Sequence, residues 1–270
     1  MTITKNHSDI LRILSEKLRY LNYSSKTVAM YSHYARRFLE AVDKPHQHLT
    51  GADFQSYLDR TKFSSISQQN QVISSIRFLY EKVLNRKYAK VDFQRPRGES
   101  RLPRIIDREY LVNRIAAIPN LKHRAILSIA FSVGLRVSEV INLRIADIDS
   151  SRMVITLRQA KGRKDRVAPL SPMVLATLRD YFRAYKPKEY LFNGQKSDKY
   201  SATSCNQLVK QYLGRQYHFH LLRHSCFTSL LESGTDIRII QRIAGHRSTR
   251  TTEIYTHVSS RVLSRVPLPL

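Results

Sequence analysis

Apolar residues recur every three to four positions in four segments of the first ninety residues. This spacing predicts four short amphipathic helices with basic, tyrosine-rich outer faces. Thr50 is followed three residues later by Asp53, which is typical of a capping box at a helix start. The four helices are expected to begin near Ser8, at Ser25, after Thr50 and near Ser67.

The helical pattern stops between Asn85 and Arg104. This stretch holds two prolines, one glycine and many charged side chains, which do not sustain a helix. We predict a basic linker at residues 95–106. Its arginines either lie along the phosphates of a nucleic acid or remain solvated, and the sequence leaves both interpretations open.

Beyond the linker, some segments have apolar residues at every second position, as in strands, and others at every third or fourth position, as in helices. Alternating positions predict strands at 152–158 and 166–170, and the polar, glycine-containing segment between them predicts a hairpin turn. Helical spacing predicts helices at 107–118, 121–135, 172–185, 201–213, 221–233 and 237–244, with a last helix that bears Tyr255. The predicted fold class is therefore mainly α with a small antiparallel β-sheet, in which a helical N-terminal domain precedes an α+β C-terminal domain.

The net charge of the chain indicates the class of molecule that it binds. Lysine and arginine number 46 against 21 acidic residues, a formal net charge of +25, which predicts a polyanion such as nucleic acid as the partner. A merely basic or ribosome-associated protein is the alternative. Hydrophobic residues make up 42% of the chain, which argues against a disordered basic tail.

Other features of the composition predict a cytoplasmic protein. The two cysteines, Cys205 and Cys226, lie far apart and match neither a zinc motif nor a disulfide framework. No apolar run approaches the ~20 residues of a membrane span. The N-terminus also lacks the apolar core of a signal peptide. We therefore expect a soluble protein in a reducing cytosol, with no membrane partner.

The C-terminal half contains an ordered set of residues suited to phosphodiester chemistry. A phenol, two guanidiniums, an ammonium and two imidazoles would let a tyrosine attack a phosphodiester without a metal. Fixed cations can stabilise the negative charge that develops on the phosphate oxygens, and guanidiniums match phosphate geometry. The candidate catalytic residues are Arg136, Lys161, His220, Arg223, His246 and Tyr255.

Each residue type suggests a role. Arg136 and Arg223 are expected to bind the phosphate oxygens. Tyr255 is expected to be the nucleophile, with its phenolate stabilised by the arginines. Lys161 stands at the predicted hairpin tip, where a flexible ammonium can protonate a leaving 5′-oxygen, although hairpin lysines are usually solvated.

The remaining candidates leave alternatives open. His220 and His246 are expected either to accept the tyrosine proton or to hydrogen-bond the phosphate. Glu139, three residues after Arg136, either holds that guanidinium within the site or forms a plain surface pair. His257 is expected on a helix surface.

No metal and no cofactor are predicted. His218, His220 and His224 do not share one helical face, no cysteine or carboxylate accompanies them, and their positive neighbours disfavour a cation. No loop of the Gly-x-x-x-x-Gly-Lys-Ser/Thr type occurs, so ATP is not implied. No carboxylate cluster suggests paired magnesium ions.

Four segments, in this order and spacing, together resemble the tyrosine recombinase (phage integrase) family. The resemblance is strong over about residues 105–258 and weaker over the first hundred. The six candidates fall on the family's catalytic positions, and the hairpin text Lys161-Gly162-x-Lys164-x-Arg166 favours Lys161 over Lys164 as the general acid. Ala160 and Ala244 depart from the family's common glycine and leucine. The segments are Gly134-Leu135-Arg136-Val137-Ser138-Glu139, His220-Leu221-Leu222-Arg223-His224, Ala244-Gly245-His246 and Thr252-Glu253-Ile254-Tyr255-Thr256-His257-Val258.

This resemblance implies a site-specific recombinase of compact Xer type, or a mobile-element integrase. It implies a clamp around double-stranded DNA, a 3′-phosphotyrosyl intermediate, a Holliday junction, and a homotetramer assembled from protomers that can be monomeric in solution. A catalytically silent DNA-binding or architectural relative is one alternative, and the intact set of six residues argues against it. A type IB topoisomerase-like enzyme is the other.

The domain organisation follows from the pattern and the resemblance together. We expect a helical DNA core-binding domain at residues 1–94, the basic linker at 95–106, a catalytic domain of tyrosine recombinase type at 107–258 and a tail at 259–270. The tail is apolar and too short to form its own core. We expect it to dock on a neighbouring protomer, and the alternative is that it packs on its own domain.

Overall fold

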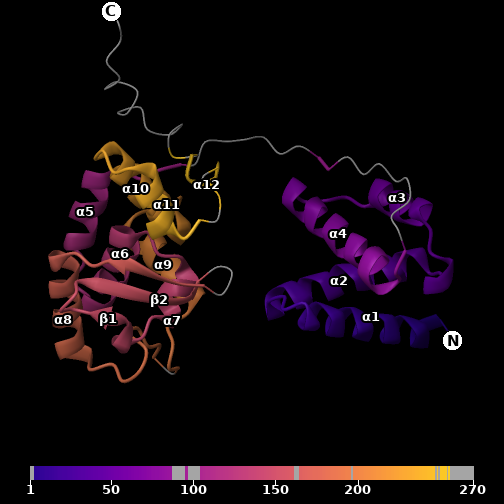
Figure 1. Cartoon of the computed structure of the whole chain (residues 1–270), viewed down its shortest axis with the longest axis horizontal. Coiled ribbons are helices and arrows are strands. Elements are labelled where there is room, and N and C mark those ends of the chain that lie inside the picture. The colour runs from indigo at the N-terminus through magenta and orange to yellow at the C-terminus, as the bar shows by residue number, and fades with distance from the viewer. Residues whose placement is uncertain are drawn as a thin grey trace, which may run out of the picture. The chain divides into compact units, whose positions relative to one another are not determined.

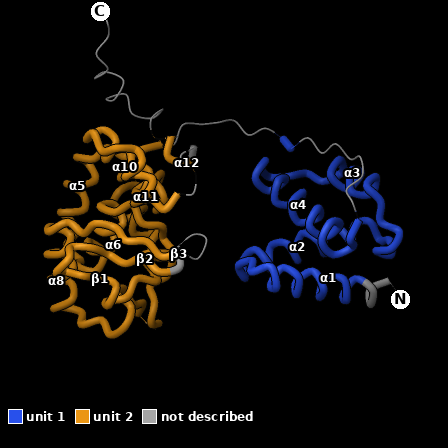
Figure 2. Tube along the Cα trace, in the orientation of Figure 1, with its two compact units in different colours: residues 1–100 blue, residues 101–270 orange. Residues whose placement is uncertain are grey.

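The protein consists of two compact units, residues 1–100 and 101–270 (Figure 2). The computed structural model describes residues 3–86, 95–96, 104–160, 164–195, 197–246, 248, 250–253 and 255. The predicted linker at residues 95–106 contains the boundary between the two units, and most of its residues lie outside the described part. None of the described helices is long and apolar enough to cross a membrane.

Within its described residues, unit 1 is built from helices only, as its hydrophobic pattern predicts. Its aromatic and aliphatic core includes Leu14, Phe38, Phe54 and Ile76, all fully buried. The edge-on contact between the rings of Phe38 and Phe54, 6.0 Å between centroids, joins two of its helices. The elements are α1 (Ile3–Tyr20), α2 (Ser25–Val42), η1 (His46–His48), α3 (Gly51–Arg60), α4 (Ile66–Phe78) and a π-helical turn η2 (Leu79–Val83) (Figure 1).

Capping side chains set the helix starts of unit 1. The predicted capping box at Thr50 and Asp53 is confirmed. Helix α2 begins at Ser25, but the cap predicted at Ser25 is one residue late, because the hydroxyl of Ser24 is the group that accepts the N–H of Thr27. The first helix begins at Ile3 rather than near Ser8. His7 is buried within it, with its Nε2 3.3 Å from the carbonyl oxygen of Lys44, so a tertiary contact extends the helix.

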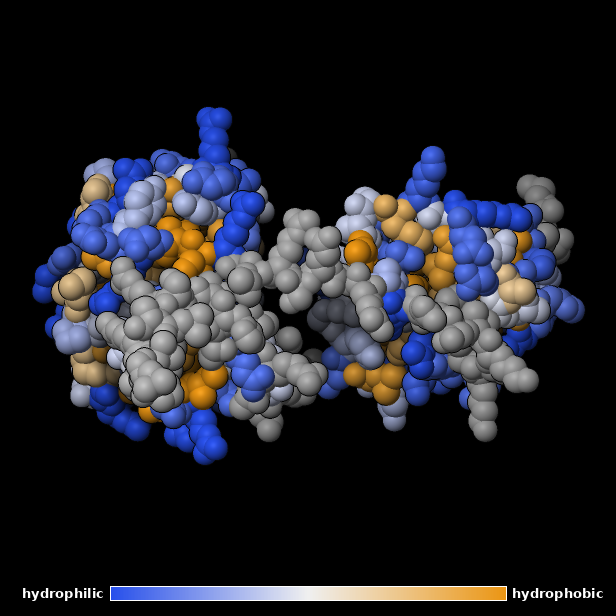
Figure 3. Space-filling model, turned by 90° about the horizontal axis from the view of Figure 1, so that it is seen from above, coloured by the Kyte–Doolittle hydropathy of each residue, from blue (hydrophilic) through white to orange (hydrophobic). Residues whose placement is uncertain are grey.

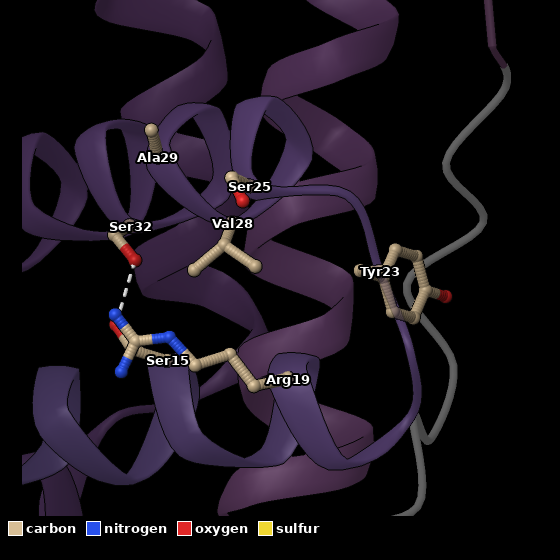
Figure 4. A pocket seen from close by; sticks show the side chains of 7 residues that line it. All are labelled: Ser15, Arg19, Tyr23, Ser25, Val28, Ala29 and Ser32. Carbon is tan, nitrogen blue, oxygen red and sulfur yellow. Dashed lines mark hydrogen bonds between the residues drawn. The ribbon is translucent and has the colours of Figure 1, made fainter.

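A small hollow of about 260 Å³ lies between α1 and α2 (Figure 4). Ser15 and Ser32 are hydrogen-bonded across it at 3.0 Å, which ties the two helices together. The guanidinium of Arg19 and the hydroxyl of Ser25 also line the hollow. The hollow is therefore lined by both polar and apolar side chains and carries the positive charge of Arg19.

Unit 2 combines helices with a three-stranded antiparallel sheet of order β1-β2-β3, which confirms the predicted fold class. In this sheet Ile155 of β2 pairs with Ala168 of β3, and both side chains are buried. The elements are α5 (Arg108–Ala116), α6 (Leu121–Val133), α7 (Val137–Asn142), η3 (Ile145–Asp147), β1 (Ile148–Asp149), β2 (Val154–Ala160), β3 (Lys164–Pro169), α8 (Pro172–Tyr185), α9 (Ala202–Tyr212), α10 (Phe219–Glu232), α11 (Ile237–Ala244) and α12 (Arg250–Glu253).

Helix α10 is the central helix of unit 2, in contact with α5, α6, α9 and α11 (Figure 1). Residues on nearly all its sides are buried, from Phe219 to Thr228. By contrast, the faces of both units visible in Figure 3 are mostly hydrophilic, with scattered hydrophobic patches. Side chains projecting from α10 therefore meet their partners inside the unit.

One prediction about the end of the catalytic half is wrong. Tyr255 does not lie within a described helix, because α12 ends at Glu253. The backbone N–H of Tyr255 instead donates to the carbonyl oxygen of Thr252 at 3.0 Å, as in a turn. The tyrosine therefore stands just beyond a short helix, held by a local backbone bond.

Candidate active site

Helix α10 supplies one face of the candidate site. His220, Arg223, His224 and Phe227 stand at positions i, i+3, i+4 and i+7, which places their side chains along one side of the helix. The rings of His220 and His224 meet edge to face, with 4.6 Å between centroids. This row of three cationic or titratable side chains and one aromatic ring forms the floor of the site.

Arg223 is the most deeply buried charged residue of this floor, at 1% exposure. Its guanidinium donates to the carbonyl oxygens of Gly134 and Ala244, each at 2.6 Å, and to Nε2 of His246 at 3.0 Å. Burial, and then the nearby charge of Arg136, lower the pKa of Arg223 to about 10. Arg223 is still a cation at neutral pH.

Two helix ends create the sites for this guanidinium. Helices α6 and α11 both end at glycines in the left-handed conformation, Gly134 with φ 64° and Gly245 with φ 63°. The carbonyl groups at a helix C-terminus carry partial negative charge, so they favour a cation there. A Cβ at Gly134 would lie 2.7 Å from the ring of Phe227, so this close approach also requires glycine.

Arg136 is held by a buried carboxylate. Glu139 is 8% exposed, and it accepts the backbone N–H of Arg136 at 2.8 Å and the Arg136 guanidinium at 2.9 Å. Burial acts to raise the pKa of Glu139, but the hydrogen bonds and charges of Arg166 and Arg136 lower it overall. Glu139 is therefore an ionised residue inside the site, and the plain surface pair considered from the sequence is excluded.

His246 links Arg223 to the end of the chain. Its Nε2 accepts from Arg223, so the proton of the neutral imidazole belongs on Nδ1, which lies 2.9 Å from the hydroxyl oxygen of Thr252. Thr252 is 1% exposed and stands three residues before Tyr255. This chain of hydrogen bonds fixes the ring of His246 between the floor and the segment that bears the tyrosine.

Tyr255 is buried at 3% exposure, against the rings of His224 and Phe227 at 5.7 and 5.5 Å between centroids. Burial raises its pKa, while the charges of Arg223 and Arg136 act to lower it. The arginines act in the expected direction, but burial outweighs them and the net shift of the Tyr255 pKa is upward. Tyr255 is a neutral phenol at neutral pH and needs a proton acceptor before or during any attack.

His220 lies at the exposed end of the floor. The burial of its ring among neighbouring atoms, and then the positive charges of His224 and Arg223, lower its pKa to about 4. Its imidazole is therefore neutral at pH 7 and free of a net charge. In this form one ring nitrogen can accept a proton or a hydrogen bond.

The structure brings five of the six predicted residues into one region of unit 2. The charge of Arg136 acts on the pKa of His220, Arg223 and Tyr255, and Arg223 contacts His246 directly. Lys161, predicted at the hairpin tip, lies outside the described residues. The side chain of Lys164 and the position of His257 also lie outside them.

Two residues of the site were missed from the sequence as participants in it. Thr252 orients His246, and Arg166 binds Glu139 with both ends of its guanidinium, at 2.5 and 3.1 Å. Arg166 belongs to the hairpin motif that begins at Lys161, and its position in that motif could have indicated that it takes part in the site. For Thr252 the sequence offered only proximity to Tyr255.

A tyrosine, arginines and imidazoles converge beside one helix, and these are the residue types expected at the site of a tyrosine recombinase. The model of the phage integrase family matches residues 108–261, and that of the phage integrase N-terminal SAM-like domain matches residues 10–90. The chain therefore belongs to the phage integrase family, and it is a tyrosine site-specific recombinase.

Individual relatives agree with this assignment. A putative integrase/recombinase, y4qK of Sinorhizobium fredii, is 33% identical over 95% of this chain and 86% of its own length. The tyrosine recombinase XerA of Pyrococcus horikoshii is 33% identical over 95% of this chain and 92% of its own. A XerH site-specific recombinase, crystallised on a palindromic difH substrate after cleavage, shares the fold with a TM-score of 0.72 at 21% identity, over 93% of this chain and 83% of its own.

Proposed function

We propose that this chain cuts and rejoins double-stranded DNA at specific sites through a covalent link between Tyr255 and a 3′-phosphate. The observation that carries the proposal is the buried network in which Arg223 contacts His246 at 3.0 Å beside the buried Tyr255. The net charge of +25 and the DNA-bound structure of a similar recombinase support DNA as the partner.

The proposed chemistry follows from the charges of the site. The Tyr255 oxygen attacks phosphorus, the bond from phosphorus to the 5′-oxygen breaks, and Lys161 protonates that oxygen as it leaves. The phenolic proton passes to one of the two imidazoles: to His220, or to Nε2 of His246 once Arg223 releases that nitrogen. Arg136 and Arg223 stabilise the negative charge on the non-bridging oxygens. The contacts described use three of the five N–H groups of Arg223, which leaves two for the phosphate.

The bond energy is retained in this scheme. Because the phosphotyrosine is an ester like the one it replaces, a 5′-hydroxyl from another strand can attack it and restore DNA without ATP. Strand exchange then proceeds through a Holliday junction, as expected from the resemblance to the family. The protein works in the cytoplasm, with residues 1–94 as the DNA core-binding domain, 95–106 as the linker and 107–258 as the catalytic domain.

Replacement of Tyr255 by phenylalanine tests the chemistry. On a nicked suicide substrate in EDTA, we expect the wild-type protein to form a covalent adduct that survives denaturing electrophoresis. Tyr255→Phe lacks the attacking oxygen, so we expect normal DNA binding and no adduct. An adduct formed by Tyr255→Phe, or a strict requirement for magnesium in the wild type, would refute the proposed mechanism.

The proposed assembly is a homotetramer on two recombination sites, in which the tail of residues 259–270 docks on a neighbouring protomer. The receptor that we propose for its apolar side chains is a hollow of about 480 Å³ in unit 2. Val112 and Met173, 43% and 76% exposed, lie at its lining together with Phe131 and Leu230. Each Leu or Val buried there would contribute about 1.5–3 kcal/mol to the protomer contact.

Deletion of residues 262–270 tests this assembly. We expect binding of a monomer to a half-site to persist, while synapsis and strand exchange are lost, as followed by gel shift and product analysis. Met173→Asp, which places a charge in the hollow, should produce the same defect with the tail intact. Native-like recombination by both variants would contradict docking in trans, and a lowered melting temperature with weaker half-site binding would place the tail on its own domain.

A further inference from the structure

Among the described arginines near the candidate site, Arg166 is the least exposed after Arg223, with 9% of its side chain accessible. Its two terminal nitrogens donate to the two oxygens of Glu139, at 2.5 and 3.1 Å, and its Nε donates to the carbonyl oxygen of Ile243 at 2.8 Å. All three nitrogens of the guanidinium are therefore engaged by the protein.

The Glu139 carboxylate is shared between two arginines. Each of its oxygens accepts one hydrogen bond from Arg136 and one from Arg166. Arg136 keeps 19% of its side chain exposed, whereas Arg166 lies behind the carboxylate. The orientation of the exposed guanidinium thus depends on a carboxylate that Arg166 fixes from the other side.

Arg166 also supports the turn that precedes His246. It binds the last turn of α11 through the carbonyl oxygen of Ile243, and a Cβ on Gly245 would lie 2.9 Å from its Cδ. The side chain therefore packs directly under Gly245, the residue before His246. Because Arg166 lies on β3, it joins the hairpin strand to both the Arg136 segment and the His246 segment.

We infer that Arg166 is a positioning residue of the recombinase reaction, which orients Arg136 through Glu139. This inference rests on the proposed function. It requires the planar, forked guanidinium, because a lysine ammonium can bind Glu139 or the Ile243 carbonyl but cannot span the two carboxylate oxygens and the carbonyl together.

Single-turnover cleavage of a suicide substrate at saturating protein tests the inference. Displacement of a catalytic group by about 1 Å can cost about 100-fold in rate, so we expect Arg166→Ala to slow adduct formation by about 10- to 100-fold. DNA affinity should change by less than about 3-fold, because the side chain faces the protein. Arg166→Lys, which keeps the charge and most of the stem, should remain slow.

Arg158→Ala is the matched control. Arg158 lies on the partner strand β2 and binds another buried carboxylate, Asp147, at 2.6 Å, but this carboxylate accepts from Arg144 rather than from a catalytic candidate. We expect Arg158→Ala to cleave bound DNA at the wild-type rate.

A double-variant cycle separates positioning from general support of the fold. If Arg166 acts through Arg136, then Arg166→Ala added to Arg136→Ala should slow cleavage by less than about 3-fold further. Losses that multiply, or wild-type cleavage by both Arg166→Ala and Arg166→Lys, would overturn the inference. Failure of the proposed function would differ, because wild-type protein would then form no adduct through Tyr255. If Arg166→Ala does not fold, judged by its melting transition, Arg166→Lys carries the test.

Discussion

The starts of α3 in unit 1 and α7 in unit 2 are built in the same way. In each helix, the carboxylate of the third residue accepts the backbone N–H of the residue that immediately precedes the helix. Asp53 accepts from Thr50 at 2.8 Å, and Glu139 accepts from Arg136 at 2.8 Å. The local sequence signal is thus nearly the same in the two units.

The surroundings of these two carboxylates differ. Asp53 meets the ammonium of Lys44, a side chain that is 51% exposed. Glu139 is 5% exposed at its side chain and meets two guanidiniums, of which that of Arg166 is 9% exposed. Because the Asp53 side chain is itself only 11% exposed, the comparison teaches that a local motif sets the helix start, while the number, charge and burial of the carboxylate's partners decide whether it also organises a reaction site.

The largest effect on the cleavage rate is expected when a buried arginine, rather than an exposed one, is replaced by lysine. Arg223→Lys should lower the single-turnover cleavage rate by about 100- to 1,000-fold, because an ammonium cannot hold both helix-end carbonyls and also present paired donors to a phosphate. Arg77→Lys in unit 1 is the control, since Arg77 pairs with Glu81 on an exposed helix face. A rate loss below about 5-fold in Arg223→Lys would contradict the importance assigned to its burial.

The next effect compares the two carboxylates directly. Glu139→Gln leaves Arg136 and Arg166 without their shared anion, so we expect cleavage to slow by about 10- to 100-fold. Asp53→Asn should lower the stability of unit 1 by about 1 kcal/mol and leave cleavage of bound DNA within 2-fold. Adduct formation and thermal unfolding measure the two effects. Equal rate losses in both variants would show that the two helix starts do not differ in function.

The smallest effect concerns acid stability. The pKa of Glu139 is lowered in the folded protein, so its contribution to stability is present above its ordinary pKa of 4.5 and disappears as pH falls through the lower folded value. Wild type should exceed Glu139→Gln in unfolding free energy by about 2 kcal/mol at pH 7, and the gap should close below about pH 4.5. Urea unfolding across this pH range measures the difference in unfolding free energy between the two proteins. A difference that does not change with pH would be inconsistent with an ionised Glu139.

The sequence predicted the fold well where hydrophobic period and capping signals agree. Helix α8 runs from Pro172 to Tyr185 as expected, because Ser171 caps it and Pro172 suits its first position. Helix α6 stops at Val133, two residues before the predicted end, since Gly134 takes the left-handed conformation. Boundaries set by tertiary contacts, such as the start of α1, were not visible in the local pattern.

The candidate site was predictable as a set of residues and not as a set of contacts. The spacing of Arg136, Arg223, His246 and Tyr255 indicated which residues belong to the candidate site. Their catalytic roles stay predictions. The upward pKa shift of Tyr255 could not be foreseen, because it arises from packing against His224 and Phe227, which the sequence does not quantify. The pairing of Arg166 with Glu139 joins positions 27 residues apart and needs the folded hairpin.

The anchoring of Arg223 has a consequence for how the enzyme tolerates change. Two of its described partners are backbone carbonyls, of Gly134 and Ala244, which no side-chain substitution removes directly. Arg136 depends instead on the Glu139 side chain, which one codon change can delete. In a library of variants of this protein selected for recombination at new target sites, we expect substitutions around Arg136 to be tolerated. We expect the position of the Arg223 guanidinium to stay unchanged in the selected variants.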